Sequence, residues 1–531
     1  MEQFFLGSLL VFWLIRAAKA SLFWLSLWQV KSYQVGRFLD HFRTAQGKKL
    51  LLYPLLGVKV IGLSLFFAFD SPFIPLLFLF LVYGAEAGKT VLDVMGRRIR
   101  VPVLTSKSIP LIGIALGLVF LVLFATRDPR VLVLYDIFIP LVVFLIVSAL
   151  QPFNLIAREL LILRPARKRR AQFPNLITIG ITGSYGKTTT KEILSHILSA
   201  KYAVLKTPEH LNSEVGIART ILKDLKREHQ VFVCEMGAYK KGEIAMFSKI
   251  SQPTMGIVTG VNEQHLATFG SMKNLLSGEG GKELVSSLPN GGVLVVNGNN
   301  AYARDLEAPK LKKKTAGFSR AYDVWAEGVQ QQKTSISFLA HSRDGDSAAF
   351  TVNLLGGHNV ENILVSASLA KELGMSMREI AERCKSIVPE LGALKLRKSR
   401  EGMNVVDSTY SANPDGVRAS LEYLAVWPGK KAIVLPSLIE LGEASADVHQ
   451  NIGEKIGEVC SLAIVTTADH FNELKAGAIK AGMTEKSVIM SANPQAILER
   501  LKSLRGPEDI ILLEGGKESA TQTELKRLLF S

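Results

Sequence analysis

The segment 177–190, which reads Ile-Thr-Ile-Gly-Ile-Thr-Gly-Ser-Tyr-Gly-Lys-Thr-Thr-Thr, constrains the fold of this chain more than any other. The β-branched residues over 177–182 predict a short buried strand of a parallel sheet. Gly183 and Gly186 then allow a tight turn whose N–H groups point inward. A helix is expected over about 189–198, with its positive N-terminal end facing the same spot. Together these elements predict an α/β domain with a cradle for phosphate groups.

The side chains of this turn suit a nucleotide. Lys187 adds a mobile positive charge, and Thr188 adds a hydroxyl of the kind that binds Mg²⁺. The strict phosphate-loop motif has a glycine where Ile181 stands, and an ordinary glycine-rich turn is the alternative interpretation. Gly-Lys-Thr between a strand and a helix favours ATP as the ligand. The residues expected to hold ATP are Gly183, Ser184, Tyr185, Gly186, Lys187, Thr188 and Thr189.

Five apolar segments occupy the first 150 residues, at about 4–29, 50–69, 72–85, 109–125 and 131–150. Most have the length that a bilayer requires, although 72–85 would need flanking residues. Lys and Arg gather in the first and third connections and after the last segment, and they are scarce in the second and fourth connections. By the positive-inside rule, this alternation predicts five transmembrane helices, an N-terminus outside and cytoplasmic catalytic domains after residue 150. A buried hydrophobic domain is the alternative, which the alternating charge disfavours.

The first apolar segment contains two charged residues, Arg16 and Lys19. It is too long and too aromatic for a cleaved signal peptide. Because a charge is costly inside a bilayer, we expect both side chains to face a polar groove or a partner helix.

The composition disfavours other classes of protein. Much of the surplus behind the formal net charge of +16 lies in loops beside apolar segments, and no nucleic-acid-binding pattern is evident. Cys234, Cys384 and Cys460 are scattered and give neither a disulfide framework nor zinc-ligand spacing, which is typical of a reducing compartment. We therefore expect a membrane protein with no nucleic-acid partner.

The rest of the chain divides where the pattern changes. Residues 151–173 are rich in Arg and Lys and are expected to form a juxtamembrane linker on anionic headgroups. Strands and helices alternate over 174–390, which predicts a central domain with a parallel sheet and an antiparallel β insert near 317–354. A smaller Rossmann-like α/β domain is expected over 391–531. The predicted fold class is thus an α-helical transmembrane region over 1–150 followed by two α/β domains.

Two more side chains follow strands of the central sheet. Glu235 ends the buried run 231–237, at the carboxyl end of a parallel strand, where a Walker-B-type Mg²⁺ ligand is found. A strand-end acid in a solvent salt bridge is the alternative. His265 follows another strand, but a lone histidine is more often structural than a ligand, so its spacing alone decides nothing.

Five ordered motifs resemble the Mur ligases. They are the phosphate loop, Cys-Glu-Met-Gly-Ala (234–238), Glu-Gln-His-Leu (263–266), Gly-Gly-His-Asn-Val-Glu-Asn (356–362) and Asp-Ser-Thr-Tyr-Ser-Ala-Asn-Pro (407–414). The resemblance covers about 174–531 and implies an ATP-dependent ligase that forms an amide bond through an acyl phosphate. The subgroup that it resembles most adds D-alanyl-D-alanine to a cell-wall precursor. The implied substrates are that precursor and an amino acid or dipeptide, and the implied location is the bacterial cytoplasmic membrane.

The resemblance also implies roles for individual residues. Lys187 would hold the β- and γ-phosphates of ATP. The implied ligands of two Mg²⁺ ions are Thr188 and Glu235 for one and His265 for the other. The implied adenine and ribose contacts are Asn359, Asn362 and Asp407. The implied substrate contacts are Asn212, Ser213, Tyr410, Asn413 and Lys517.

Among the departures of the chain from the family, two concern the catalytic charge and the acceptor. The family has a carbamylated lysine about fourteen residues after the histidine, where a direct count gives Glu279 and a short insertion gives Lys282. Glu279 would supply the same negative charge without CO₂. The family's N-terminal domain, which binds a UDP sugar, has no visible counterpart, and the apolar segments stand in its place. We therefore expect a lipid-linked or membrane-proximal acceptor rather than a soluble UDP-linked one.

Three other functions remain open from the sequence. One is glutamate-chain elongation of the folylpolyglutamate or poly-γ-glutamate type, on another acceptor. Another is a membrane P-loop ATPase that drives transport or signalling. The third is a membrane scaffold with a degenerate ligase domain.

Overall fold

The computed structural model describes residues 2–31, 33, 35–42, 45–51, 54–96, 98–105, 107–209, 211–388, 394–409, 412–515 and 519–530. The chain separates into two compact units, Met1–Glu159 and Leu160–Ser531. In the described residues, the first unit has one apolar core, and the second unit has cores on both faces of two sheets.

The first unit is helical in its described part. Its helices are α1 (Glu2–Val30), α2 (Val35–His41), α3 (Ala45–Leu51), α4 (Pro54–Ala68), α5 (Phe73–Met95), α6 (Ser108–Ala125) and α7 (Pro129–Arg158). Five stretches are long and apolar enough to cross a membrane: Gln3–Val30, Gly47–Ala68 (which includes two residues outside the described part), Phe73–Met95, Ser108–Ala125 and Pro129–Arg170. This finding rests on length and composition, so the transmembrane topology stays a prediction.

The two charged residues of α1 both pair with α5. Arg16 Nε lies 2.9 Å from Glu86 Oε1, and Lys19 Nζ lies 2.7 Å from Asp93 Oδ2. The expectation that these charges face a partner helix is therefore confirmed. The pairs also explain why α5 is longer than the apolar segment 72–85, because its polar second half contacts α1.

A buried lysine links three helices of this unit. Lys59 of α4 lies 2.8 Å from Glu86 Oε2 and also pairs with Asp136 of α7. The hydroxyl of Tyr83 donates a hydrogen bond of 3.0 Å to Asp136 Oδ2. Lys59, Glu86 and Asp136 are each at most 7% exposed, so these charges depend on one another for compensation.

The second unit begins with helix, where the sequence predicted a linker. A π-helical turn, η1 (Glu159–Leu163), leads into α8 (Arg164–Arg170). Arg170 is 3% exposed, and its guanidinium donates hydrogen bonds to the carbonyls of Phe173, Leu176, Ser251 and Gln252. This basic side chain therefore faces the protein rather than headgroups, because four backbone acceptors converge on it.

The central sheet has nine strands in the order β2-β3-β1-β4-β5-β6-β7-β8-β9. They are β1 (Ile177–Thr182), β2 (Val204–Lys206), β3 (Val231–Glu235), β4 (Met255–Val258), β5 (Val293–Asn297), β6 (Lys312–Gly317), β7 (Val324–Gln331), β8 (Ile336–Ser342) and β9 (Ser347–Val352). The pairs from β2 through β7 are parallel, and β7-β8-β9 are antiparallel. The predicted insert therefore continues the main sheet instead of forming a separate one.

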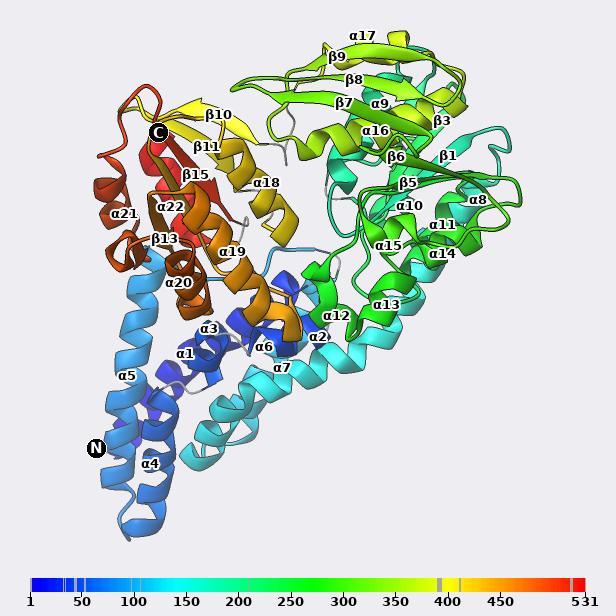
Figure 1. Ribbon diagram of the computed structural model, residues 1–531. Coiled ribbons are helices and arrows are strands. Elements are labelled where there is room, and N and C mark those ends of the chain that lie inside the picture. The colour runs from blue at the N-terminus through cyan, green and yellow to red at the C-terminus, as the bar shows by residue number, and fades with distance from the viewer. Residues whose placement is uncertain are drawn as a thin grey trace. The chain divides into compact units, whose positions relative to one another are not determined.

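Helices cover both faces of this sheet (Figure 1). One face packs against α9 (Lys187–Leu198), α16 (His358–Glu372) and α17 (Met377–Cys384). The other packs against α8, α10 (Glu214–Lys223), α11 (Glu243–Ser251), α13 (Met272–Ser277) and α14 (Lys282–Ser287). Short helical pieces η2 (Glu263–His265), α12 (Leu266–Phe269) and α15 (Ala301–Arg304) complete the domain. The single helix expected within 271–288 is thus two short helices with a turn between them.

The C-terminal sheet has six strands in the order β10-β11-β15-β12-β13-β14. They are β10 (Lys395–Lys398), β11 (Asn404–Ser408), β12 (Lys431–Leu435), β13 (Leu462–Val465), β14 (Val488–Met490) and β15 (Ile510–Glu514). The helical pieces are α18 (Pro414–Leu424), η3 (Gly442–Ala444), α19 (Ser445–Val459), α20 (Phe471–Lys480), η4 (Glu485–Ser487), α21 (Pro494–Leu501) and α22 (Ala520–Phe530). Among the described strands of this sheet, only β10 is antiparallel. The sequence did not indicate it, because a short charged edge strand carries no apolar pattern.

Candidate active site

The phosphate loop connects β1 to α9 and requires glycine at two positions. Gly183 has φ +140° and Gly186 has φ +76°, which L side chains rarely adopt. A Cβ on Gly183 would lie 2.1 Å from Thr259 Oγ1, and a Cβ on Gly186 would lie 2.6 Å from Asn362 Oδ1. The helix then begins at Lys187, so its free N–H groups face the loop.

On one side of the loop, a threonine, a glutamate and an asparagine converge. The hydroxyl of Thr188 donates a 2.9 Å hydrogen bond to Glu235 Oε1, and the amide of Asn212 donates a 3.0 Å bond to the same oxygen. Pairing of β1 with β3 places Glu235 opposite Ile181, at the carboxyl ends of both strands. Three residues named from sequence therefore meet at one point.

This pair of oxygens fits Mg²⁺. Adjacent ligands of an octahedral Mg²⁺ at about 2.1 Å lie about 3 Å apart, and Thr188 Oγ1 and Glu235 Oε1 are 2.9 Å apart. Within the described residues no group of three or more His, Cys, Asp or Glu side chains could hold a metal ion. Mg²⁺ at nucleotide sites usually takes one or two protein oxygens and completes its shell with phosphates and water, so the small donor set suits it.

On the other side of the loop, a buried carboxylate joins the remaining groups. Glu279 has no exposed surface, and its Oε1 lies 2.9 Å from His265 Nδ1 and 3.6 Å from Lys187 Nζ. Its Oε2 accepts a 2.9 Å bond from the hydroxyl of Ser184. Burial acts to raise the pKa of Glu279, but the charges of His265 and Lys187 and these hydrogen bonds outweigh it, so the pKa lies below its usual value.

The Glu279–His265 pair also suits a metal-binding histidine. In the neutral imidazole, a carboxylate at Nδ1 keeps the single proton on that nitrogen and leaves the lone pair of Nε2 for a metal ion. The ring of Tyr239 packs edge-on against His265 with 5.2 Å between centroids and restricts its orientation.

Lys282 does not join this cluster. It is exposed at the first position of α14, whereas Glu279 lies in the turn between α13 and α14 and points inward. Between the two candidates for the family's negative charge, the geometry favours Glu279.

The asparagines of the adenine motif lie directly behind the loop. Asn362 Oδ1 accepts a 3.1 Å bond from the hydroxyl of Thr190, and Asn362 Nδ2 donates to Asn359 Oδ1 at 3.3 Å. Asn359 Nδ2 donates to the carbonyl of Leu355. Both asparagines are at most 7% exposed, so the structure gives them loop-supporting contacts.

The other sequence-derived residues are dispersed. Ser213 accepts from the Gly216 N–H at the start of α10, and Asn413 accepts from the Gly416 N–H at the start of α18, so both are helix caps. Asp407, at the end of β11, pairs with Lys526 across 2.8 Å. Tyr185 and Thr189 are half-buried in the loop and the first turn of α9. Tyr410 and Lys517 lie outside the described residues.

Sequence reasoning missed one charged residue of the site. Lys191 has no exposed surface, and its Nζ lies 3.3 Å from Glu235 Oε2. It follows Lys187 by one helical turn, and residues four apart share a face of a helix, which is the signal that indicates it.

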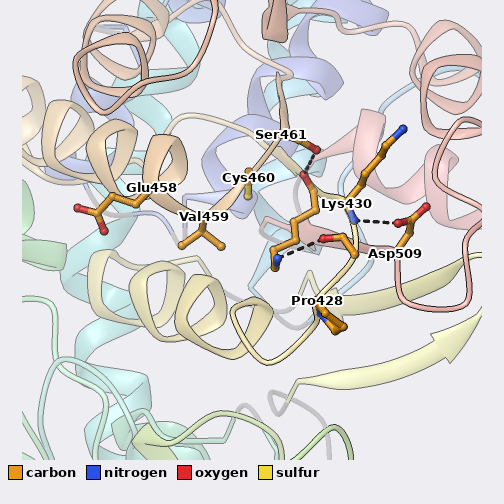
Figure 2. A pocket seen from close by; sticks show the side chains of 9 residues that line it. Pro428, Lys430, Glu458, Val459, Cys460, Ser461 and Asp509 are labelled. Atoms are coloured by element: carbon orange, nitrogen blue, oxygen red, sulfur yellow. Dashed lines mark hydrogen bonds between the residues drawn. The ribbon is translucent and has the colours of Figure 1, made fainter.

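A hollow on the C-terminal domain lies away from these groups. Figure 2 shows its lining, which includes Pro428, Lys430, Glu458, Cys460 and Asp509. These residues lie just before the amino ends of β12, β13 and β15, whereas ligands of open parallel sheets bind at the carboxyl ends of the strands. Backbone and short side-chain bonds such as Lys430 N to Asp509 Oδ1 hold it together. The hollow therefore contributes nothing to the candidate active site.

A phosphate loop in a parallel sheet, with a second α/β domain behind it, defines a nucleotide-dependent enzyme. The family model for the Mur ligase middle domain matches residues 181–370, and that for the Mur ligase glutamate ligase domain matches 394–516. The chain belongs to the Mur ligase family, whose members form amide bonds with ATP.

Relatives of known name support this membership. The chain is 30% identical over 369 residues to a UDP-N-acetylmuramoyl-tripeptide–D-alanyl-D-alanine ligase of Mycobacterium leprae, covering 64% of this chain and 71% of the relative. It is 26% identical over 355 residues to the enzyme of that name from Bacillus subtilis, covering 66% and 76%.

Solved structures give the same result. MurF from Acinetobacter baumannii superposes with a TM-score of 0.62 at 27% identity, covering 68% of this chain and 78% of the other. The MurF ligase from Thermotoga maritima in complex with ADP gives 0.60 at 25% identity, covering 69% and 83%. The prediction of a Mur ligase with a parallel-sheet central domain and a C-terminal α/β domain is confirmed.

Proposed function

We propose that this protein is a MurF-type ligase that joins D-alanyl-D-alanine, or a similar amino acid or dipeptide, to a cell-wall precursor at the cytoplasmic membrane. The observation that carries the ligase chemistry is the phosphate loop with Thr188 and Glu235 on one side and Lys187, Glu279 and His265 on the other. The relatives supply the substrates, since the named enzymes act on a UDP-linked tripeptide and this dipeptide.

The chemistry follows from the weakness of a carboxylate as an electrophile. Transfer of the γ-phosphoryl group of ATP to the acceptor carboxylate gives an acyl phosphate and ADP. The amine then attacks, and phosphate leaves from the tetrahedral intermediate. Lys187 and the loop N–H groups bind and neutralise the phosphates, so catalysis consists mainly of positioning and charge stabilisation.

Mg²⁺ would be held by Thr188 and Glu235, with a second ion at His265, and would supply further neutralisation of the phosphate charge. Glu279 supplies the negative charge that the carbamylated lysine supplies in the family. It lies within reach of both Lys187 and His265 and orients the two toward the nucleotide.

The first unit supports a multi-pass membrane location. Its five candidate spans expose large apolar side chains, for example Phe67 at 80% and Phe124 at 82%, which suit contact with lipid. The basic loops favour an outside N-terminus and cytoplasmic catalytic domains. Neither family model includes the first unit. Since the family's UDP-sugar-binding domain has no visible counterpart, the acceptor that we propose is a lipid-linked or membrane-proximal precursor.

The test is ADP release by the purified full-length protein in detergent with added lipid. The UDP-linked tripeptide precursor and its lipid-linked counterpart are offered as acceptors, each with D-alanyl-D-alanine or with L-glutamate. Release that requires the dipeptide supports the proposal, and a preference for the lipid-linked acceptor supports the membrane part of it.

Other outcomes contradict the proposal in distinct ways. Release with L-glutamate alone indicates glutamate-chain elongation, and ATP turnover that ignores amines indicates a transport ATPase. Equal background activity in the wild type and in Lys187→Ala indicates a scaffold without ligase activity.

A further inference from the structure

Lys191 is a fully buried charged group beside the phosphate loop. It lies on α9, one turn after Lys187, and has no exposed surface. Its Nζ lies 3.1 Å from Glu192 Oε1 and 3.3 Å from Glu235 Oε2. A lysine is almost never fully buried unless it is paired, so the two carboxylates determine its place.

The contacts of Glu235 divide between its two oxygens. Oε1 accepts hydrogen bonds from Thr188 and Asn212, at 2.9 and 3.0 Å. Oε2 faces Lys191, whose Nζ has no hydrogen-bond partner of good geometry among the described residues. The attraction between Lys191 and Glu235 is therefore mainly electrostatic, and it acts on one oxygen only.

The rest of the cluster explains how the lysine keeps its place. Glu192 is shared by Lys191 and by Lys206 of β2, whose side chain is 41% exposed. Two lysines thus face two glutamates, so the buried charges of Lys191 and Glu235 belong to a balanced group.

We propose that Lys191 is a positioning residue that makes Glu235 a one-oxygen ligand and thereby favours Mg²⁺ over Ca²⁺ in the ATP site. The positive charge of Lys191 beside Oε2 repels a metal ion from that oxygen, which leaves Oε1, next to the Thr188 hydroxyl, as the oxygen that binds the ion. Mg²⁺ requires near-octahedral geometry with single-oxygen carboxylate ligands, whereas Ca²⁺ readily takes both oxygens of a carboxylate. This inference rests on the proposed ATP function of the site.

The test compares ATP binding to the full-length protein in detergent, by calorimetry, in EDTA, in Mg²⁺ and in Ca²⁺. The variant is Lys191→Met, which keeps the length and removes the charge. The matched control is Glu192→Gln, which breaks the same cluster but keeps the Lys191–Glu235 pair. Melting temperatures without nucleotide report the structural cost of each change.

Lys191→Met is expected to bind metal-free ATP with the wild-type affinity. The increase in ATP affinity that Mg²⁺ produces should be about tenfold smaller than in the wild type, because changes behind a metal ligand usually weaken metal binding. Its preference for Mg²⁺ over Ca²⁺ should fall in parallel, while Glu192→Gln keeps the wild-type preference. If Lys191→Met does not fold, the double variant Lys191→Met/Glu192→Gln takes its place, because it removes one charge of each sign. Its ATP affinities in Mg²⁺ and in Ca²⁺ are then compared with those of Glu192→Gln.

Three results would overturn the inference. An unchanged Mg²⁺-to-Ca²⁺ ratio in a folded Lys191 variant overturns this inference alone, as does an equal loss in Glu192→Gln. Absence of ATP binding by the wild type overturns the proposed function together with it.

Discussion

Nδ1 of His265 lies 2.9 Å from Oε1 of Glu279, a carboxylate with no exposed surface. The same oxygen lies 3.6 Å from Lys187 Nζ, so one buried carboxylate connects the histidine to the lysine of the phosphate loop. A carboxylate in this place sets the orientation and proton position of the imidazole and draws the lysine toward the site. The pair therefore links two motifs that lie far apart in the sequence.

Glu279→Gln should lower kcat for ADP release by about 10- to 100-fold, because the amide keeps the shape but not the charge that orients His265 and Lys187. The matched control is Lys282→Met, an exposed position that should leave the rate unchanged. Wild-type activity should also persist after bicarbonate is removed. Wild-type kcat in Glu279→Gln together with loss of activity in Lys282→Met would instead support a carbamylated Lys282.

Gly186→Ala should abolish ATP binding in a protein that still folds. The added methyl group meets Asn362 Oδ1 at 2.6 Å in a backbone conformation with φ +76°. Gly242→Ala is the matched control, since Gly242 also has a positive φ of +92° but has open space around it. Both variants carry a strain of about 1 kcal/mol, so a difference in ATP affinity between them isolates the collision with Asn362. Equal affinities would contradict the model of a loop braced by Asn362.

Much of the central domain follows from the sequence because its strands are buried on both faces. The motif around Glu235 and the loop at Lys187 are local, and their meeting follows from the rule that ligands gather at the carboxyl ends of parallel strands. The role of Asn362 could not be read in the same way, because its contact with Gly186 depends on packing between α16 and the loop.

The burial of charged side chains and their tertiary partners were the other part that local patterns missed. Lys191 and Arg170 each stand in a sequence of ordinary polar or basic residues, and only the tertiary structure shows that both are buried. The sequence did indicate that Arg16 needed a partner, but it could not name Glu86, seventy residues away. Burial of a charge is a property of the assembled fold.

Arg170→Lys should destabilise the catalytic unit almost as much as Arg170→Ala, by on the order of 3 kcal/mol, because buried carbonyls lose their donors. The guanidinium donates to four carbonyls from two segments of the chain, 173–176 and 251–252, and a lysine ammonium cannot reach them all. Lys168→Ala changes an exposed neighbour on α8 and should have little effect. Chemical unfolding of the detergent-solubilised protein measures all three, and a fully stable Arg170→Lys would contradict the account.

Glu514→Gln should make stability less dependent on pH. Burial raises the pKa of Glu514 to about 8, although bonds from Ser408 and Ser420 act in the opposite direction. The folded protein then keeps a proton that the unfolded chain, with a pKa of 4.5, has lost. Stability should fall as pH rises from about 4.5 to about 8 and level off above, by about 1.4 kcal/mol for each unit of pKa difference.

The measurement is the melting temperature at pH 5.5 and at pH 8.5. Between pH 5.5 and pH 8.5, the melting temperature of the wild type should fall more than that of Glu514→Gln, because the amide carries no charge to bury. The comparison of each variant with itself removes any constant effect of the amide on packing. Parallel curves for the two proteins would show that Glu514 is not protonated in the folded state at pH 5.5.

Lys59→Met should destabilise the first unit more than Lys59→Met/Asp136→Asn. Lys59 stands between Glu86 and Asp136, and its loss leaves a buried carboxylate without a counter-charge, at a cost of about 3–5 kcal/mol. Removing the Asp136 charge as well leaves Glu86 paired with Arg16, so part of the loss should be recovered. Arg130→Ala breaks an exposed pair with Asp128 and should cost less than about 1 kcal/mol. Thermal aggregation of the detergent-solubilised protein ranks the wild type, these three variants and the single variant Asp136→Asn. Additive effects of the Lys59 and Asp136 changes would contradict the coupling, because independent sites add.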